Sequence, residues 1–122
     1  MWNKQYAYYK TKKVGGYDSG FEAGYAHRLE RQKKAGEIVG FETHKRIPLV
    51  VNGYTVCDYY IDFVVFHNDD TVEYLETKGY PTPIWKLKWK IFLANFENDP
   101  NVKITLVMQG SLQPKFRMRK PL

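Results

Sequence analysis

The alternation of apolar and polar residues predicts a β-hairpin in the middle of the chain. Two runs rich in β-forming residues, 60–66 and 71–79, flank a short acidic turn at 68–70. A three-residue loop places Asp62 directly across from Glu76, because opposite residues of an antiparallel pair share a face. A loop one residue shorter would send Glu76 to the other face.

The three-residue loop also gathers charge on one patch of this hairpin. Lys78 lies two residues beyond Glu76, so the period of two puts it on the same face. Like charges directly opposite each other are destabilising, and a divalent cation would bind Asp62 and Glu76 through hard oxygen ligands. The alternative interpretation is that these residues are solvated charges on an edge hairpin.

A helix is predicted before the hairpin. Ser19 and Glu22 have the spacing of a capping box at its start, and Gly36 marks its end. Two roles are open to Glu22: it closes the cap, or it adds a third carboxylate on the side of the helix that faces the hairpin. Asp58 has the same strand parity as Asp62 and competes for that third position.

Further strands are predicted between the helix and the acidic turn. Extended structure starts at 38–41 and continues at 47–51, before the strong hairpin signal Asn52-Gly53. The apolar run that follows is long for one strand, so we expect a bend or bulge near Cys57-Asp58.

A second helix and a last strand complete the order of elements. Thr82 is a helix cap followed by Pro83, and an aromatic stripe at helical spacing predicts a core face, made of Trp85, Trp89, Phe92 and Phe96. Residues 102–108 form a strand that fits a parallel crossover. The pattern predicts an α/β fold with the order helix, three strands, helix, strand and a mixed sheet.

Length and composition limit the function classes. The chain has 122 residues, enough for one domain, and it is 43% hydrophobic and 16% aromatic, which excludes a disordered chain. A membrane helix needs about 20 apolar residues, and no run approaches this length. Cys57 is the lone cysteine, which excludes an internal disulfide and fits a reducing cytoplasm. The three histidines show no ligand spacing, so a histidine-based metal site is not expected.

The net charge of +6 favours an acidic partner, of which nucleic acid is the commonest. The acids lie mostly between Glu37 and Glu76, and the bases surround them in the sequence. An acidic centre within a basic surround suits a metal-dependent enzyme that acts on a polyanion. We expect phosphate contacts from basic clusters of the first segment and of both helices, namely Lys12, Lys13, Lys33, Lys34, Lys86, Lys88 and Lys90.

The order of these elements and motifs resembles the PD-(D/E)XK nuclease superfamily, whose fold has a restriction-endonuclease-like core. The resemblance rests on Asp62 followed by Glu76-Thr77-Lys78 on adjacent strands, after a helix bearing Glu22. The chain is most similar to a small phage and prophage family within that superfamily, over about 10–107. The matching stretches are 17–23, 32–38, 62–64 and 76–79, then Thr82-Pro83 with the lysine-rich helix after it.

The resemblance implies a metal-dependent endonuclease that hydrolyses DNA phosphodiester bonds. Asp62, Glu76 and Glu22 would hold Mg²⁺, with Mn²⁺ as a substitute, and Lys78 would position the attacking water. The domain would span 17–110, between a basic arm at 1–16 and a basic tail at 111–122. No element reads bases, so we expect selectivity for branched or junction DNA, and paired cuts would suit a homodimer. A DNA-binding module that kept the fold and lost cleavage is the alternative.

Overall fold

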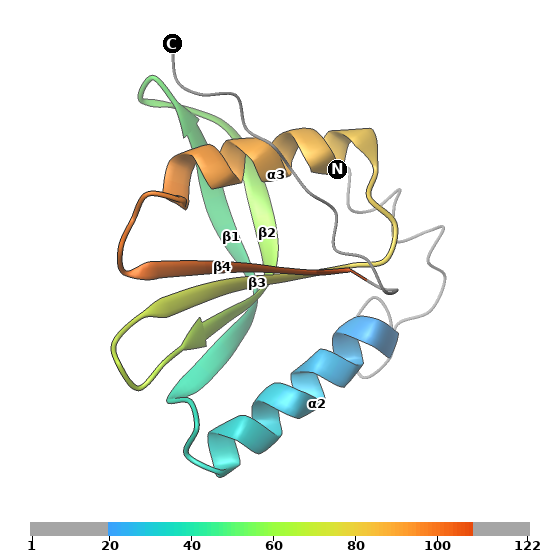
Figure 1. The fold of residues 1–122 in the computed structure, drawn as a ribbon. Coiled ribbons are helices and arrows are strands. Elements are labelled where there is room, and N and C mark those ends of the chain that lie inside the picture. The colour runs from blue at the N-terminus through green and yellow to red at the C-terminus, as the bar shows by residue number, and fades with distance from the viewer. Residues whose placement is uncertain (1–19, 109–122) are drawn as a thin grey trace.

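The computed structural model of the protein describes residues 20–108. In this range the order of elements is helix, three strands, helix, strand, as the sequence predicts (Figure 1). The elements are α2 (Gly20–Lys34), β1 (Gly40–Val51), β2 (Tyr54–Phe66), β3 (Val72–Lys78), α3 (Pro83–Phe96) and β4 (Val102–Met108). Ser19 of the predicted capping box, the arm at 1–16 and the tail at 111–122 lie outside the described residues.

The strands form a mixed sheet in the order β1-β2-β3-β4, with helices on both faces (Figure 1). β1 and β2 are antiparallel, as are β2 and β3, whereas β3 and β4 are parallel and are joined through α3. The predicted parallel crossover and the α/β class are therefore confirmed. Neither α2 nor α3 has the length and apolar character that crossing a membrane requires.

The core on one face of the sheet is built around α3. Its aromatic stripe faces this core as predicted: Trp85 and Phe92 are fully covered, Trp89 is 2% exposed, and Phe96 is partly buried against them. These rings pack on apolar side chains of β1 and β2, including Ile47 and Tyr59. The predicted cap is also present, because the Thr82 hydroxyl accepts a hydrogen bond from the Trp85 backbone N–H at 3.1 Å.

The core on the opposite face lies beneath α2. Ala26 and Leu29 of this helix pack with Phe63, Val65 and Leu75 of the sheet. The helix ends as predicted at Gly36, which has a φ of +76° that glycine adopts readily. The backbone N–H groups of Gly36 and Glu37 return to the carbonyls of Lys33 and Gln32, which is a Schellman motif.

Both predicted hairpin turns are present. Asn52 and Gly53 have positive φ angles, as a type I′ turn requires. In the acidic turn the His67 N–H donates to the Thr71 carbonyl at 3.0 Å, so the loop has three residues and the two-residue alternative is wrong. Asp70 accommodates the loop with a φ of +67°.

The first strand differs from its prediction. Residues 42–46 are polar and lack the apolar–polar alternation of a strand. β1 nevertheless continues through these residues, because it pairs with β2 along its length. The bulge expected near Cys57-Asp58 is found at the neighbouring position. Leu49 pairs with Cys57 and Val50 with Thr55, so one residue of β2 has no opposite partner.

The long hairpin of β1 and β2 changes faces near its middle. Tyr59 and Ile61 of β2 belong to the core beneath α3, whereas Phe63 and Val65, with the same parity, belong to the core beneath α2. Regular alternation would keep all four on one face. The change occurs at Asp62, and in β1 it accompanies a left-handed residue, His44, with a φ of +52°.

Candidate metal centre

The candidate site lies where the backbone pairing of β2 with β3 ends. The ladder runs from Phe66–Val72 to Phe63–Leu75, and the next positions in this register are Asp62 and Glu76, as predicted. Beyond Phe63–Leu75, backbone N–H groups donate to side-chain carboxylates instead of to backbone carbonyls. The Asp62 N–H donates to Glu76 Oε1 at 3.1 Å, and the Thr77 N–H donates to Asp62 Oδ2 at 2.8 Å. We call this place, made of Asp62, Glu76 and Thr77, the strand fork.

Asp62 is held at the strand fork in an environment that opposes its charge. Its Oδ2 accepts hydrogen bonds from both the backbone N–H and the hydroxyl of Thr77, each at 2.8 Å. Burial, together with the nearby carboxylates of Glu76 and Glu22, nevertheless raises the pKa of Asp62 well above its ordinary value, against the opposing effect of Lys78. A cation nearby would favour the ionised form of such a carboxylate.

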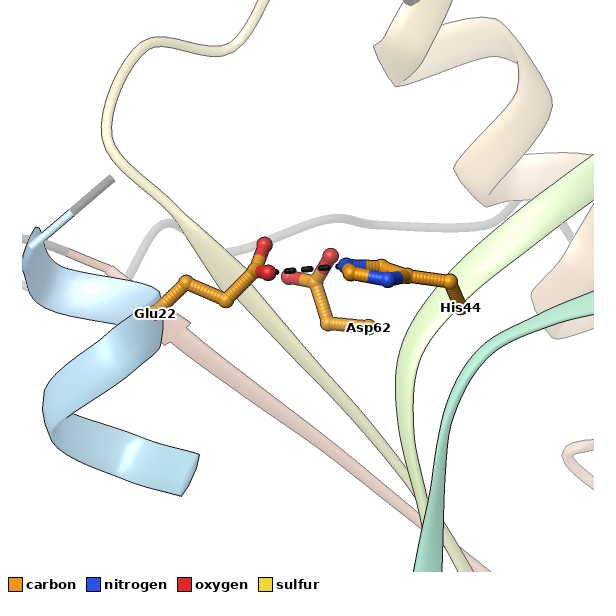
Figure 2. A group of neighbouring side chains, drawn as sticks. All are labelled: Glu22, His44 and Asp62. Carbon is orange, nitrogen blue, oxygen red and sulfur yellow. Dashed lines mark hydrogen bonds and ion pairs between the residues drawn. The ribbon is translucent and has the colours of Figure 1, made fainter. Parts of the chain in front are cut away.

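Two further ligand groups join Asp62 from distant parts of the sequence. Glu22 comes from the first turn of α2, and His44 comes from β1, beside Asp62 on the neighbouring strand (Figure 2). One ligand atom from each of the three residues lies within 4.8 Å of the others. Glu22 is only 5% exposed, and its Oε2 lies 2.8 Å from His44 Nε2. We call Glu22, His44 and Asp62 the ligand cluster.

Glu76 lies beside the ligand cluster with its carboxylate turned towards α3. It is 1% exposed, and its Oε2 accepts hydrogen bonds from the Tyr59 hydroxyl at 2.5 Å and from Trp85 Nε1 at 3.0 Å. Burial and the Glu76 carboxylate raise the pKa of Tyr59, so this phenol stays protonated and donates. Although β2 changes faces at Asp62, the two carboxylates remain close enough that Glu76 raises the pKa of Asp62.

Lys78 shares the face of Glu76, as the period of two predicts. Its Nζ lies 3.6 Å from Glu76 Oε2 and 5.0 Å from the centre of the Trp85 ring, and the residue is 6% exposed. A buried ammonium of this kind is retained only with compensating partners. Lys78 thus lies directly beside the Glu76 carboxylate, and its charge also lowers the pKa of Asp62.

The structure separates the two candidates for the third carboxylate. Asp58 pairs with Arg46 at 4.0 Å on the hairpin, and it is not a member of the ligand cluster. Glu22 is the residue that reaches Asp62, so its inward position on α2 is confirmed. Its predicted role as part of a cap with Ser19 involves a residue outside the described range.

The predicted DNA-binding lysines are divided among three places. Lys86 and Lys90 are exposed on α3, whose first turn touches Glu76 through Trp85. Lys88 is partly buried, and its Nζ donates to the Asp58 carbonyl at 3.2 Å. The other pair, Lys33 and Lys34, lies in the last turn of α2, about 16 Å along the helix from Glu22. Lys12 and Lys13 lie outside the described residues.

His44 is the site residue that the sequence did not indicate. The sequence predicts no histidine in a metal site, whereas the structure places His44 with Glu22 and Asp62 in a group whose spacing could hold an ion. Spacing along the chain could not identify it, since its partners come from other elements at 22 and 62. The pairing of β1 with β2 brings it there: Thr43 faces Phe63 and Lys45 faces Ile61, which places His44 opposite Asp62.

The fold and the ligand cluster define an α/β protein with a candidate cation site at the end of a strand pair. Carboxylate oxygens and an imidazole nitrogen are both ligands of divalent metals in proteins, so the donor set fits such an ion. Residues 5–113 match the family DUF1064, described as a protein of unknown function, and the chain belongs to this family. No curated protein and no solved structure matches the chain.

Proposed function

We propose that this protein is a metal-dependent endonuclease that hydrolyses DNA phosphodiester bonds. The observation that supports this most is the ligand cluster beside a buried lysine, at the point where two strands of an α/β sheet separate. Asp62, Lys78 and Glu22, together with Glu76, also carry the chain's resemblance to the PD-(D/E)XK nucleases. Mg²⁺ is the proposed cofactor, with Mn²⁺ as a substitute, and the bacterial cytoplasm, in a phage or prophage context, is the proposed setting.

The metal would be held by Asp62 and Glu22, with Glu76 beside them at the strand fork. When bound, a divalent cation supplies Lewis-acid chemistry and lowers the pKa of a bound water. Asp62 is suited to this task because its Oδ2 is fixed by Thr77 and its carboxylate already lies among like charges. A cation there would favour the ionised form of Asp62.

The chain's own residues would orient the reacting groups. Lys78 is held next to Glu76 and against the Trp85 ring, so its ammonium has little freedom. In this position it would stabilise negative charge that develops on a phosphate and orient the attacking water. The network of Tyr59, Trp85 and Glu76 would position Lys78 without touching the substrate.

Contact with DNA would come from the exposed basic face of α3. Lys86 and Lys90 project from the helix whose first turn adjoins the strand fork. Lysine contacts to phosphates position a duplex and are blind to its sequence. We therefore propose selectivity for DNA structure, such as a branch or a four-way junction, and a homodimer that makes paired cuts.

Cleavage of labelled DNA tests the proposal. Four-way junction, flap and linear duplex substrates would be incubated with Mg²⁺, Mn²⁺ or EDTA, using the wild type and the variants Asp62→Asn and Glu76→Ala. We expect metal-dependent cutting that both variants abolish. Asp58→Asn is the matched control, since it removes a carboxylate of the same strand that lies outside the ligand cluster, and it should cut like the wild type.

The alternative function, a DNA-binding module without cleavage, is distinguished by the same substrates. Tight binding to DNA with no cutting under any metal would support that module and refute the enzyme. If neither binding nor cutting is observed, both proposals fail. Loss of cutting in Asp58→Asn as well would show that the carboxylates act through stability and not at the reacting phosphate.

A further inference from the structure

The imidazole of His44 makes the ligand cluster different from a site of oxygen ligands alone. Mg²⁺ requires oxygen ligands and binds with one or two carboxylates and several waters. Imidazole nitrogen is a favourable ligand for first-row transition metals, and the affinity of such a site rises along the series from Mn²⁺ to Cu²⁺. In this protein one nitrogen ligand and two carboxylates, from Glu22 and Asp62, converge within 4.8 Å.

The spacing of the three groups agrees with direct ligation by His44. Two neighbouring ligands of an octahedral ion, each about 2.1 Å from the metal, are separated by about 3 Å. The observed distance from His44 Nε2 to Glu22 Oε2 is 2.8 Å. No pair in the cluster exceeds 4.8 Å, so small side-chain shifts would close it around one ion. An ion would then replace the hydrogen bond that joins the two residues in the metal-free protein.

The backbone of β1 is shaped to present this imidazole. His44 has a φ of +52°, which is uncommon for a residue other than glycine. Its neighbours Thr43 and Lys45 pair regularly with β2, so the irregular conformation is confined to one position. That position lies opposite Asp62, where β2 also changes faces. The conformation places the His44 side chain with Glu22, which is 95% covered and anchored in α2.

We propose that His44 is a direct ligand and makes this centre selective for a first-row transition-metal ion over Mg²⁺. The inference changes the preferred metal of the proposed function from Mg²⁺ to a first-row transition-metal ion such as Mn²⁺, and it rests on that function only in treating the ligand cluster as the metal centre. Because binding is measured without DNA, it can fail or succeed independently of cleavage.

The test is metal binding by tag-free protein, using Co²⁺, Mn²⁺ and Mg²⁺ as probes in calorimetric titrations, with the visible absorption of Co²⁺ as a second readout. The central variant is His44→Asn, because asparagine tolerates a positive φ and offers an oxygen in place of nitrogen. His44→Gly is a second variant whose backbone also accepts this conformation. His27→Ala, which removes an exposed imidazole of α2, is the matched control.

The wild type should bind Co²⁺ and Mn²⁺ more tightly than Mg²⁺. Both His44 variants should weaken Co²⁺ binding by about tenfold or more and shift its visible absorption, while changing Mg²⁺ binding by less than about threefold. His27→Ala should match the wild type. Equal Co²⁺ affinity and an unchanged Co²⁺ spectrum in folded His44→Asn would overturn the inference.

The proposed nuclease activity and the proposed metal selectivity can each fail independently of the other. If Mg²⁺-dependent cleavage is found and His44 has no effect on Co²⁺ binding, only the selectivity is wrong. If Co²⁺ binds through His44 and no DNA is cut with any metal, the ligand is correct and the nuclease is not.

Discussion

Replacing Asp62 by asparagine should stabilise the metal-free protein while removing its response to metal. The side chain keeps its shape, and its Oδ1 can still accept the hydrogen bonds that Thr77 donates to Asp62. What disappears is a negative charge within 4.8 Å of a Glu22 oxygen. The raised pKa of Asp62 shows that burial and the neighbouring carboxylates outweigh the attraction of Lys78 in the folded protein.

The magnitude follows from the distance between the charges. Two unit charges 4.8 Å apart repel by about 3.5 kcal/mol at an effective dielectric constant of about 20. Asp62 is partly exposed to solvent, so screening and the loss of the Lys78 attraction reduce the gain to about 1 kcal/mol. For a chain of this length that corresponds to a rise in Tm of roughly 3–6 °C.

The sign of the pH dependence is fixed by the direction of the pKa shift. Asp62 has a folded pKa above its unfolded pKa of about 4, so the folded state binds more protons between these two values. Its contribution to the free energy of unfolding therefore falls as the pH rises from about 4 through the folded pKa. Asp62→Asn lacks this loss. The difference in free energy of unfolding between the variant and the wild type should therefore grow as the pH rises through that window, and it should vanish in acid.

Thermal unfolding with EDTA and with metal measures both effects. Metal at about 100 times its Kd should stabilise the wild type by about 2.7 kcal/mol and leave Asp62→Asn unchanged. Asp58→Asn, which removes a carboxylate paired with Arg46, should show neither the gain in EDTA nor the loss of the metal response. A lower Tm for Asp62→Asn in EDTA, or an undiminished metal response, would refute the reasoning.

Three further substitutions, one of them with a matched control, test separate parts of the structure. Tyr59→Phe removes the hydroxyl that donates to Glu76 and accepts from Trp85, so it should destabilise the fold by about 1–2 kcal/mol in chemical denaturation. Lys90→Ala should reduce the steepness with which log DNA affinity falls against log salt concentration by about 1. Lys34→Ala, at the far end of α2, should leave this slope unchanged. Gly36→Ala should lower the free energy of unfolding by about 1 kcal/mol, because the φ of Gly36 is +76°. It should not alter metal binding.

Each of these expectations has a contrary result. Unchanged stability of Tyr59→Phe would mean that Glu76 and Trp85 find equivalent partners without the hydroxyl. Equal salt slopes for Lys90→Ala and the wild type would place the DNA elsewhere than on α3. Altered metal affinity in Gly36→Ala would show that the end of α2 is coupled to Glu22 at its start.

Most of the elements were predictable because they have a strong local signal. Asn52-Gly53 allows few turns besides a type I′ turn, the spacing of Trp85 and Trp89 defines one helical face, and Thr82 caps that helix through its side chain. The three-residue acidic loop then fixed the register that places Asp62 opposite Glu76. Local patterns of this kind act within a few residues, which is the range over which the sequence can be interpreted directly.

The arrangement within the site was less predictable because it depends on an irregularity. Period-two reasoning assumes that a strand keeps its faces, and β2 changes them at Asp62. Glu76 therefore bonds to Trp85 of α3, while Asp62 lies near Glu22 of α2. His44 lies within a polar stretch of β1 with no strand signal, and only the pairing with β2 brings it to Asp62. Its φ of +52° has no sequence signature such as glycine.

The change of faces in the β1–β2 hairpin also has a consequence for cooperativity. It gives the domain two hydrophobic clusters, one under each helix, that are joined through shared strands. Glu22 belongs to α2, which packs on one cluster, and Glu76 bonds to Tyr59 and Trp85 of the other. A cation at their junction would link two units that can otherwise open separately. Amide hydrogen exchange should then slow in both α2 and α3 on metal binding, and detachment of α2 alone would be enough to dismantle the centre.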